Sequence, residues 1–308
     1  MSLPELKVPP SARGGILAIG NFDGVHRGHQ AMVKEVARIA EANGHASVIV
    51  TFAPHPITIL KPTVDLPTLT SISDRKRLLK SFGADEVVVL PTTAELLEMS
   101  PVEFFTDVIL RRFEARGVVE GPDFRFGKNR SGDVTTLRML CDQHKLSMHV
   151  IDVVESNGQV ISSSQIRRLI QAGQIREANS SLGHNFCVSG TVSRGAKRGR
   201  TIGFPTANLT EIEAMLPLDG VYAGRCELNG RHHAVAVSIG PNPTFAEGDR
   251  KVECHVIGFN GDLYGIELTV QLEKRLRDLQ AYSTTDALVA AISADVEECS
   301  RVVNTIME

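Results

Sequence analysis

The first half of the chain alternates short apolar runs with segments of helical periodicity. The apolar runs lie at residues 15–20, 47–52, 86–90 and 117–120. Short runs of this kind are typical of strands buried in a parallel sheet. Between the first two runs, apolar side chains recur at helical spacing, at Met32, Val33, Val36, Ile39 and Ala40. Further helices are indicated at residues 74–82 and 102–114. Parallel strands joined by crossover helices predict a doubly wound α/β domain.

The second half has a different pattern, in which Asn-Gly pairs separate extended runs. Residues 222–228 and 232–239 flank Asn229-Gly230, and residues 252–259 and 263–272 flank Asn260-Gly261. Asn-Gly between extended runs is a strong hairpin signal. A last stretch, residues 286–303, has helical periodicity. The pattern predicts a small antiparallel β-barrel closed by a C-terminal helix.

The change of pattern marks a domain boundary. Two short helices are indicated at residues 164–172 and 174–181, and the boundary follows them, near residues 182–186. A chain of 308 residues has room for two domains, at roughly 100–200 residues each. We expect domains at residues 1–183 and 184–308.

Composition narrows the class of protein. The net charge is −3, from 33 basic and 36 acidic residues, so no global basic field favours a nucleic acid. The five cysteines include no CxxC pair, which argues against a disulfide framework or a thiolate zinc site. No apolar run approaches the ~20 residues that span a bilayer, and the N-terminus lacks a signal-peptide core. We expect a soluble cytoplasmic protein of undetermined oligomeric state.

Residues 20–29, GNFDGVHRGH, connect the first strand to the first helix. A helix start carries unpaired N–H groups and partial positive charge, which suits phosphate. His26 and His29 are three residues apart, so both can point at the same phosphates and stabilise developing charge. The residues expected to contact the phosphate there are Gly20, Asn21, Phe22, Asp23, Gly24 and Gly28. A glycine-rich turn with surface histidines is the plainer alternative; zinc has too few ligands, and a P-loop lacks its Gly-Lys-Ser/Thr.

A serine cluster opens the helix near residue 164. Ser163 and Ser164 offer hydroxyl and N–H groups, and Arg167 offers a fork of donors for phosphate oxygens. The alternative is an N-capped surface helix.

A basic glycine loop and a polar strand follow in the second half. The loop contains Gly195, Lys197, Arg198, Gly199 and Arg200, which the family resemblance described below implies cover the phosphates of a nucleotide. A solvated loop or an RNA contact is the alternative. Thr206 and Asn208 are two apart, so in an extended segment both side chains face one way, and their oxygens suit Mg²⁺.

These segments carry a resemblance. Residues 20–29 resemble the HxGH-bearing loop of the nucleotidyltransferase superfamily, and more narrowly the GxFDGxHxGH pattern of bacterial bifunctional riboflavin kinase/FMN adenylyltransferases. Residues 51–56, 121–127 and 161–167 resemble that family's second, third and fourth motifs. Residues 203–208, GFPTAN, resemble the motif of riboflavin kinases, whose fold is a small antiparallel barrel. The resemblance covers about residues 14 to 300.

The resemblance implies two reactions with Mg-ATP, riboflavin to FMN and FMN to FAD. It implies that Glu253 is the base of the kinase and that Thr206 and Asn208 hold Mg-ATP. His26, His29 and Arg167 would stabilise the adenylyl transfer. The expected flavin-binding residues are His55, Pro56, Asp123 and Phe124. Ala53 stands where many members have an acid and Asn242 where many have Arg, so neither is given a role.

Three alternatives stay open at this stage. In the first alternative, the chain catalyses only one of the two reactions. In the second, the N-terminal domain adenylylates another phosphate ester. From a different class, the chain binds nucleic acid through residues 194–200. The acidic balance and the lack of aromatic residues near that loop count against the last alternative.

Overall fold

The computed structural model describes residues 8–152, 155–156, 159–195, 198–242, 244 and 247–307. The chain forms two compact units. The first comprises residues 1–66 and 71–162, and the second comprises residues 67–70 and 163–308. Each unit is described by itself.

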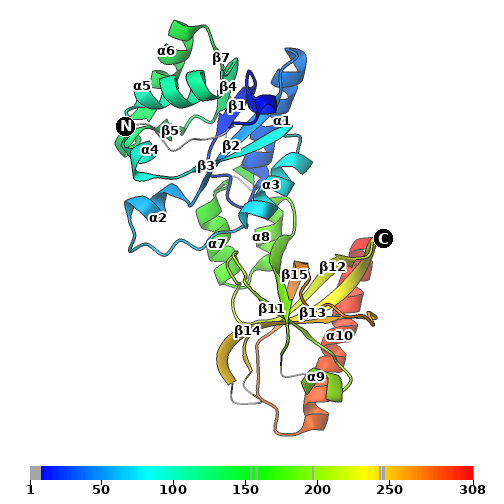
Figure 1. The fold of residues 1–308 in the computed structure, drawn as a ribbon. Helices are drawn as coiled ribbons and strands as arrows, with labels where there is room; N and C mark the ends of the chain where they lie inside the picture. The colour runs from blue at the N-terminus through cyan, green and yellow to red at the C-terminus, as the bar shows by residue number, and fades with distance from the viewer. Residues whose placement is uncertain are drawn as a thin grey trace. The chain divides into compact units, whose positions relative to one another are not determined.

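The first unit is a five-stranded parallel sheet with helices on both faces (Figure 1). Its strand order is β3-β2-β1-β4-β7. The strands are β1 (Ile16–Ile19), β2 (Ser47–Ala53), β3 (Glu86–Pro91), β4 (Gly117–Glu120) and β7 (Ser147–Val150). The order and the parallel pairing confirm the predicted doubly wound architecture.

Two apolar clusters hold helices on the two faces of this sheet. One cluster joins β1 and β2 to α1 and α3, through Ile16, Ile49, Val33 and Leu79. The other joins the opposite face to α5, η2 and α6, through Leu17, Phe104, Ile109 and Leu137. The helices are α1 (Arg27–Ala42), α2 (Pro56–Leu60), α3 (Ile72–Ser81), α4 (Ala94–Glu98), α5 (Pro101–Phe104), η2 (Phe105–Arg112) and α6 (Val134–His144). The helix predicted at 102–114 is present, and η2 is its π-helical part.

Short elements complete the first unit. These are η1 (Pro10–Ala12), β5 (Arg125–Phe126), η3 (Lys128–Arg130), β6 (Gly132–Asp133), β8 (Glu155–Ser156) and β9 (Gln159–Val160).

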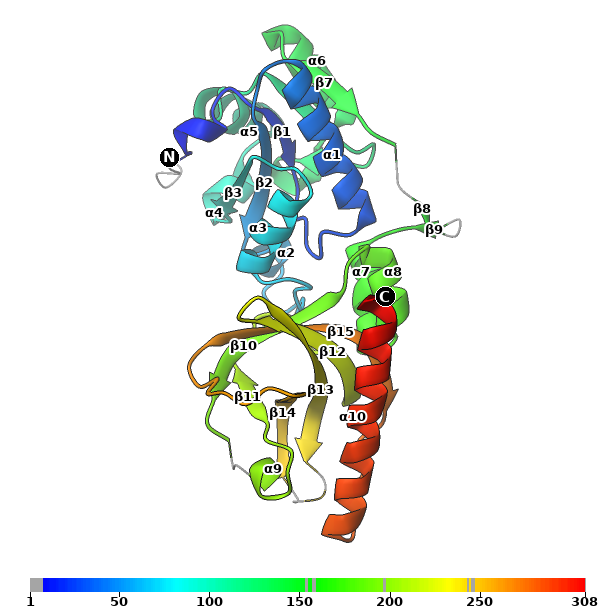
Figure 2. The same cartoon turned by 90° about the vertical axis from the view of Figure 1, so that its right-hand side faces the viewer.

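The second unit is a closed six-stranded antiparallel barrel in the order β10-β11-β14-β13-β12-β15, with a long C-terminal helix along it (Figure 2). Its elements are α7 (Ser163–Gln171), α8 (Ile175–Leu182), β10 (Phe186–Ser193), α9 (Arg198–Thr201), β11 (Ala207–Thr210), β12 (Gly220–Leu228), β13 (Arg231–Asn242), β14 (Glu247–Val256), β15 (Glu267–Arg277) and α10 (Thr285–Met307). The predicted barrel and its closing helix are confirmed.

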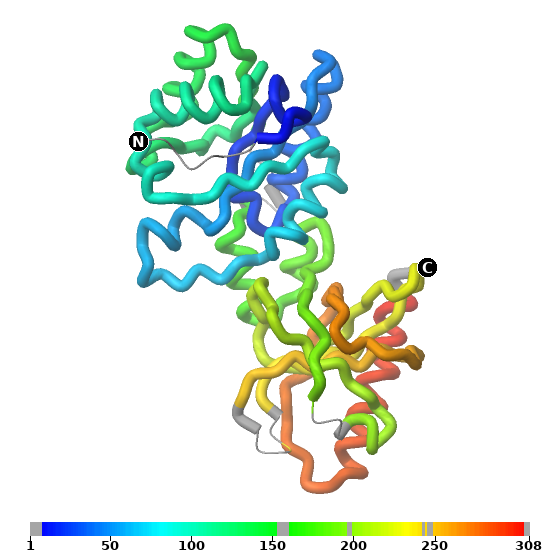
Figure 3. Tube along the Cα trace, viewed as in Figure 1, coloured from blue at the N-terminus to red at the C-terminus, as the bar shows by residue number. Residues whose placement is uncertain are grey.

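One of the two predicted hairpins is wrong. β12 and β13 pair across Asn229-Gly230 as expected. β14 and β15 do not pair across Asn260-Gly261, because β14 is flanked by β11 and β13, whereas β15 is flanked by β10 and β12. The chain after β14 therefore crosses to the far side of the barrel, as the trace in Figure 3 shows.

Helices α7 and α8 belong to the same compact unit as the barrel. The side chain of Asn179 donates to the carbonyl of Leu272 at 2.8 Å and accepts from the N–H of Phe186 at 2.8 Å. These bonds attach α8 to β15 and β10. The functional boundary at residue 183 stays a prediction.

Candidate functional site

The first candidate site lies where β1 ends and α1 begins. β1 has β2 on one side and β4 on the other, so the direction of the strand order reverses there. Ligands of open α/β sheets bind beyond the carboxyl ends of strands at such a point. Glu120, at the end of β4, accepts a hydrogen bond from the N–H of Ile19 at 2.8 Å. Burial raises the pKa of Glu120 well above its usual value.

The loop between β1 and α1 is strained and tightly packed. Phe22 and Val25 have positive φ angles of 48° and 40°, although neither is glycine. A β-branched residue in that region is strained and persists only where its surroundings impose it. Both side chains are buried, and Gln30 donates to the carbonyl of Val25 at 2.8 Å. The loop is therefore held in one shape by its packing.

His26 and His29 come together on this loop. Their rings stack with centroids 3.6 Å apart, and Phe22 meets the His29 ring edge-on at 5.1 Å. A Cβ atom at Gly28 would crowd the His26 ring, at 3.2 Å from it. Burial lowers the pKa of His29 well below its usual value, and His26 and Arg75 lower it further. His29 is therefore neutral near pH 7 and can donate one N–H to a ligand.

Two polar atoms in the loop region remain available to a ligand. Asn21 Oδ1 and His29 Nδ1 are buried and have no hydrogen-bond partner among the residues that the structure describes. Buried polar atoms are nearly always paired, so unpaired ones mark a place where a polar group binds.

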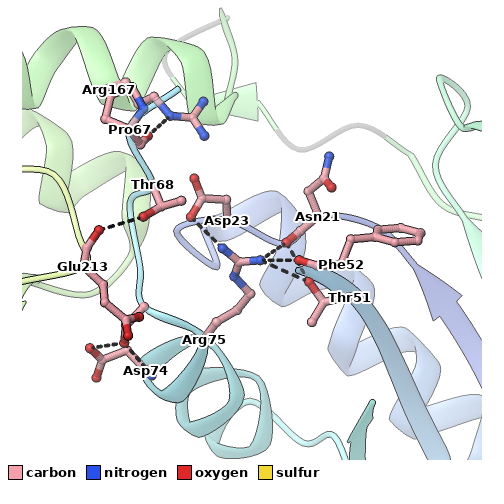
Figure 4. Close-up of polar contacts among 11 residues, drawn as sticks. Asn21, Asp23, Thr51, Phe52, Pro67, Thr68, Asp74, Arg75, Arg167 and Glu213 are labelled. Atoms are coloured by element: carbon pink, nitrogen blue, oxygen red, sulfur yellow. Dashed lines mark hydrogen bonds and ion pairs between the residues drawn. The ribbon is translucent and has the colours of Figure 1, made fainter. Parts of the chain in front are cut away.

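No sequence pattern pointed to Arg75, which supports this loop from α3. Its guanidinium pairs with the carboxylate of Asp23 at 3.1 Å and donates to the carbonyl of Asn21 at 2.9 Å (Figure 4). An arginine in an amphipathic helix normally faces solvent, so only the fold reveals this contact. Asp23, predicted to contact ATP phosphates, is buried beside this arginine.

The predicted flavin-binding residues follow β2 and β4, the two neighbours of β1. His55 caps α2, because its Nδ1 accepts from the N–H of Ile57 at 3.2 Å, and Pro56 is the first residue of that helix. Asp123 is exposed, and Phe124 packs on the core beside Phe126, with ring centroids 5.5 Å apart. Carboxyl ends of parallel strands share one edge of the sheet, so these segments flank the histidine loop.

Ser163, Ser164 and Arg167 lie together on α7, in the second compact unit. Arg167 is buried, and its Nε donates to the carbonyl of Pro67 at 2.8 Å (Figure 4). The assignment of these residues to the ATP phosphates stays a prediction.

The second candidate site is a cavity of about 910 Å³ in the barrel unit. Asn208 on β11 pairs directly with Glu253 on β14, and Glu253 pairs in turn with Ser238 on β13. These three side chains and Thr206 line the cavity. The structure thus brings the predicted base and both predicted metal ligands into one cavity.

The glycine loop closes on the same side chains. A Cβ atom at Gly195 would collide with the side-chain amide of Asn208, and one at Gly199 would collide with the carbonyl oxygen of Phe204. Both glycines line the cavity, and Arg200 lines a smaller neighbouring one of about 70 Å³. Lys197 lies outside the described residues, and Arg198 is described only as backbone at the start of α9.

The cavity has donors suited to Mg²⁺. Within the described part of the chain, no group of three or more His, Cys, Asp or Glu side chains could hold a metal ion. Thr206 and Asn208 instead present hydroxyl and amide oxygens to one cavity, which the carboxylate of Glu253 also lines. Mg²⁺ uses a few hard oxygen ligands and shares the remainder with substrate phosphates and water, so this set fits it.

Two further contacts at the cavity were not predicted. His255 donates from Nδ1 to the carbonyl of Pro205 at 2.8 Å, which braces the turn before Thr206. Arg277 forms a two-bond pair with Asp295 of α10, at 3.0 and 2.7 Å. His255 is two residues from Glu253 and so faces the same side of β14, a signal that the sequence did contain.

Two family models match the chain in succession. The model of FAD synthetase matches residues 8–165, and the model of riboflavin kinase matches residues 182–303. The chain is 34% identical over 286 residues to a bifunctional riboflavin kinase/FMN adenylyltransferase of Listeria monocytogenes, covering 92% of this chain and 90% of that protein. It is 31% identical to the enzyme of the same name from Escherichia coli (strain K12), with 92% and 90% covered.

A solved structure resembles the whole chain. A Streptococcus pneumoniae structure titled as a macrolide-efflux protein matches with a TM-score of 0.85 and 30% identity, covering 96% of each chain. No helix in the described residues of the present chain is long and apolar enough to cross a membrane.

Proposed function

The chain belongs to the family of bifunctional riboflavin kinases/FMN adenylyltransferases, and on that premise we propose that it converts riboflavin to FMN and FMN to FAD, with ATP as the second substrate of both reactions. The proposal rests on one observation: each of the two family models matches a segment that contains one of the two candidate sites. The histidine loop lies within the segment matched by the FAD synthetase model, and the cavity with Glu253 lies within the segment matched by the riboflavin kinase model.

In the barrel, the ribityl 5′-hydroxyl of riboflavin attacks the γ-phosphorus of ATP. Glu253 accepts the hydroxyl proton, a bond forms between that oxygen and phosphorus, and ADP leaves. Thr206 and Asn208 would hold Mg²⁺, which neutralises phosphate charge when bound. Residues 194–200 would cover the phosphates with backbone N–H groups. Such transfer depends mostly on positioning and electrostatics.

In the first unit, a phosphate oxygen of FMN attacks the α-phosphorus of ATP, and pyrophosphate leaves. A phosphate monoester is already an anion near neutral pH, so the reaction needs no strong base. It needs donors for the charge on the transferring phosphate. The N–H groups of His26 and His29 and the guanidinium of Arg167 are the proposed donors.

The deciding experiment supplies the protein with riboflavin and Mg-ATP and separates the flavins over time. FMN followed by FAD is the expected result. Two ATP analogues separate the steps. With β,γ-imido-ATP, added FMN should still give FAD, whereas riboflavin should give no FMN. With α,β-methylene-ATP, riboflavin should give FMN that goes no further. Formation of neither flavin product with ATP would refute the proposal.

A further inference from the structure

Arg75 is a buried cation whose guanidinium contacts the segments that carry the first site. It projects from α3, and its side chain is 3% exposed. Its Nη1 atom donates to the carbonyl of Asn21 at 2.9 Å and lies 3.3 Å from Thr51 Oγ1, and Nη2 lies 3.1 Å from Asp23 Oδ1 (Figure 4). Asn21 and Asp23 follow β1, and Thr51 lies near the end of β2, so one guanidinium ties two strand ends together.

Stability alone does not account for this pair. Removing two charges from water is costly, and an apolar pair of similar volume often serves stability as well. The Asp23 side chain is 2% exposed, so the cost applies in full. What the pair provides is a fixed geometry, because the guanidinium fork contacts four oxygens at set directions, the fourth being the carbonyl of Phe52 at 3.4 Å.

The loop that Arg75 contacts is the one that needs outside support. Phe22 and Val25 on either side of Asp23 and Gly24 have unfavourable positive φ angles. Thr51 adds a second bond to the same carbonyl, donating from Oγ1 to Asn21 at 2.8 Å. Without these bonds the loop would relax, and His26 and His29 at its end would move.

Arg75 also changes the charge around the site. A bare carboxylate at Asp23 would repel the phosphates of ATP, and the guanidinium cancels that repulsion. The groups that lower the pKa of His29, besides its burial, are His26 and Arg75. The arginine therefore helps to keep His29 neutral and able to act as an N–H donor.

We propose that Arg75 is a positioning residue for adenylyl transfer, which fixes the Asn21–Val25 loop and its histidines through the buried contacts to Asp23, Asn21 and Thr51. The inference rests on the proposed function of the first unit. Arg75 acts through these residues, and the proposal gives it no contact with substrate.

The test compares three variants with the full-length wild-type protein. Arg75→Met removes the cation and should slow FAD formation from FMN by roughly 10²-fold, the scale expected when reacting groups are misplaced by about 1 Å. Arg75→Lys keeps the cation but loses the fork, so it should show an intermediate loss of about tenfold, because an ammonium with three donors serves only some of the same oxygens. Arg77→Met is the matched control on the same helix, since Arg77 is half exposed and pairs with Asp74; its FAD formation should be unchanged.

A second readout separates positioning from general loss of structure. The pKa of His29, followed by NMR of ¹⁵N-labelled imidazoles and assigned by its loss in His29→Ala, should rise in Arg75→Met and stay low in Arg75→Lys. Riboflavin phosphorylation by the same samples should be unchanged. If Arg75→Met does not fold in the first unit, Arg75→Lys decides, and a wild-type rate of FAD formation in that folded variant overturns the proposal.

The outcomes also separate this inference from the proposed function. A wild-type protein that makes no FAD refutes the function itself. A wild-type protein that makes FAD, with Arg75→Met within twofold of it, overturns the inference alone.

Discussion

Asn208 and Glu253 are direct partners across two antiparallel strands of the barrel. Directly opposed residues place their Cβ atoms about 4.5–5.5 Å apart. The proposed metal ligand and the proposed base are thus fixed to each other by a ladder of backbone hydrogen bonds. Sites built on strands hold their geometry better than sites built on loops.

This pairing gives a test of the base. Glu253→Gln keeps the size and the strand position but removes the proton acceptor, so riboflavin phosphorylation should fall by about 10²–10⁴-fold. Conversion of added FMN to FAD should persist. Glu227→Gln, on an exposed position of β12, is the control and should keep wild-type kinase turnover. Normal turnover in Glu253→Gln would exclude Glu253 as the base.

The stacked histidines give a test of the first site. His29→Ala should slow FAD formation by roughly 10²-fold, the scale for loss of one charge-stabilising donor, and leave FMN formation unchanged. The measurement is single-turnover conversion of FMN with saturating Mg-ATP. A mutant that makes FAD at the wild-type rate would contradict the role given to His29.

The lowered pKa of His29 gives a test of stability against pH. A buried neutral histidine binds its proton less readily in the folded state than in the unfolded state. Its contribution to stability is full above the unfolded pKa of about 6.5 and is lost as pH falls from there through the folded value. The melting temperature of the wild-type protein should therefore fall more between pH 7 and pH 5 than that of His29→Gln. Parallel curves for the two proteins would contradict the assignment.

The raised pKa of Glu120 predicts the opposite dependence of stability on pH. Its raised pKa means that the folded state holds the proton more tightly, so the carboxyl destabilises the fold as pH rises above about 4.5 toward the folded value. Glu120→Gln keeps an acceptor for the N–H of Ile19 and carries no charge. It should raise the melting temperature at pH 8 more than at pH 5. Glu41→Gln, at an exposed position of α1, should change neither.

The attachment of α8 to the barrel predicts how fragments behave. Residues 184–308 should phosphorylate riboflavin but make no FAD. Residues 163–308 should also do so and should melt higher, because they keep the Asn179 contacts to Leu272 and Phe186. Loss of one or two such bonds costs about 1–2 kcal/mol, which is roughly 2–8 °C for a domain near 150 residues. A folded 163–308 fragment without kinase activity would refute the two-site interpretation.

Short sequence patterns predicted the elements whose formation depends on neighbouring residues in the chain. Apolar runs and helical spacing located the strands and helices of the first sheet, and Asn229-Gly230 located a true hairpin. Asn260-Gly261 misled because a turn signal does not say which strand edges are already occupied. β14 has a partner on each edge. Its residue Glu253 pairs with Asn208, 45 residues earlier in the chain, and with Ser238, 15 residues earlier.

The candidate sites show the same difference between what depends on neighbouring residues and what depends on distant ones. Motifs identified residue types that bind phosphate and metal, because those types recur at short spacing. Arg75 was missed since its partner Asp23 lies 52 residues away in the chain. Only burial distinguishes it from Arg77, which sits one half-turn further along the same helix and reaches solvent.

The segment Pro67–Thr70 interrupts the first unit in sequence but belongs to the second in contacts. Thr68 accepts from the N–H of Met215 through its carbonyl at 2.8 Å and donates from Oγ1 to the carbonyl of Glu213 at 3.1 Å. The backbone therefore passes between the units three times, after residues 66, 70 and 162. No single cleavage or recombination point can release the second unit whole. A gene split anywhere between codons 70 and 213 would separate the Glu213–Met215 segment from its partner peptide, so the threading of the chain favours one reading frame for the two units.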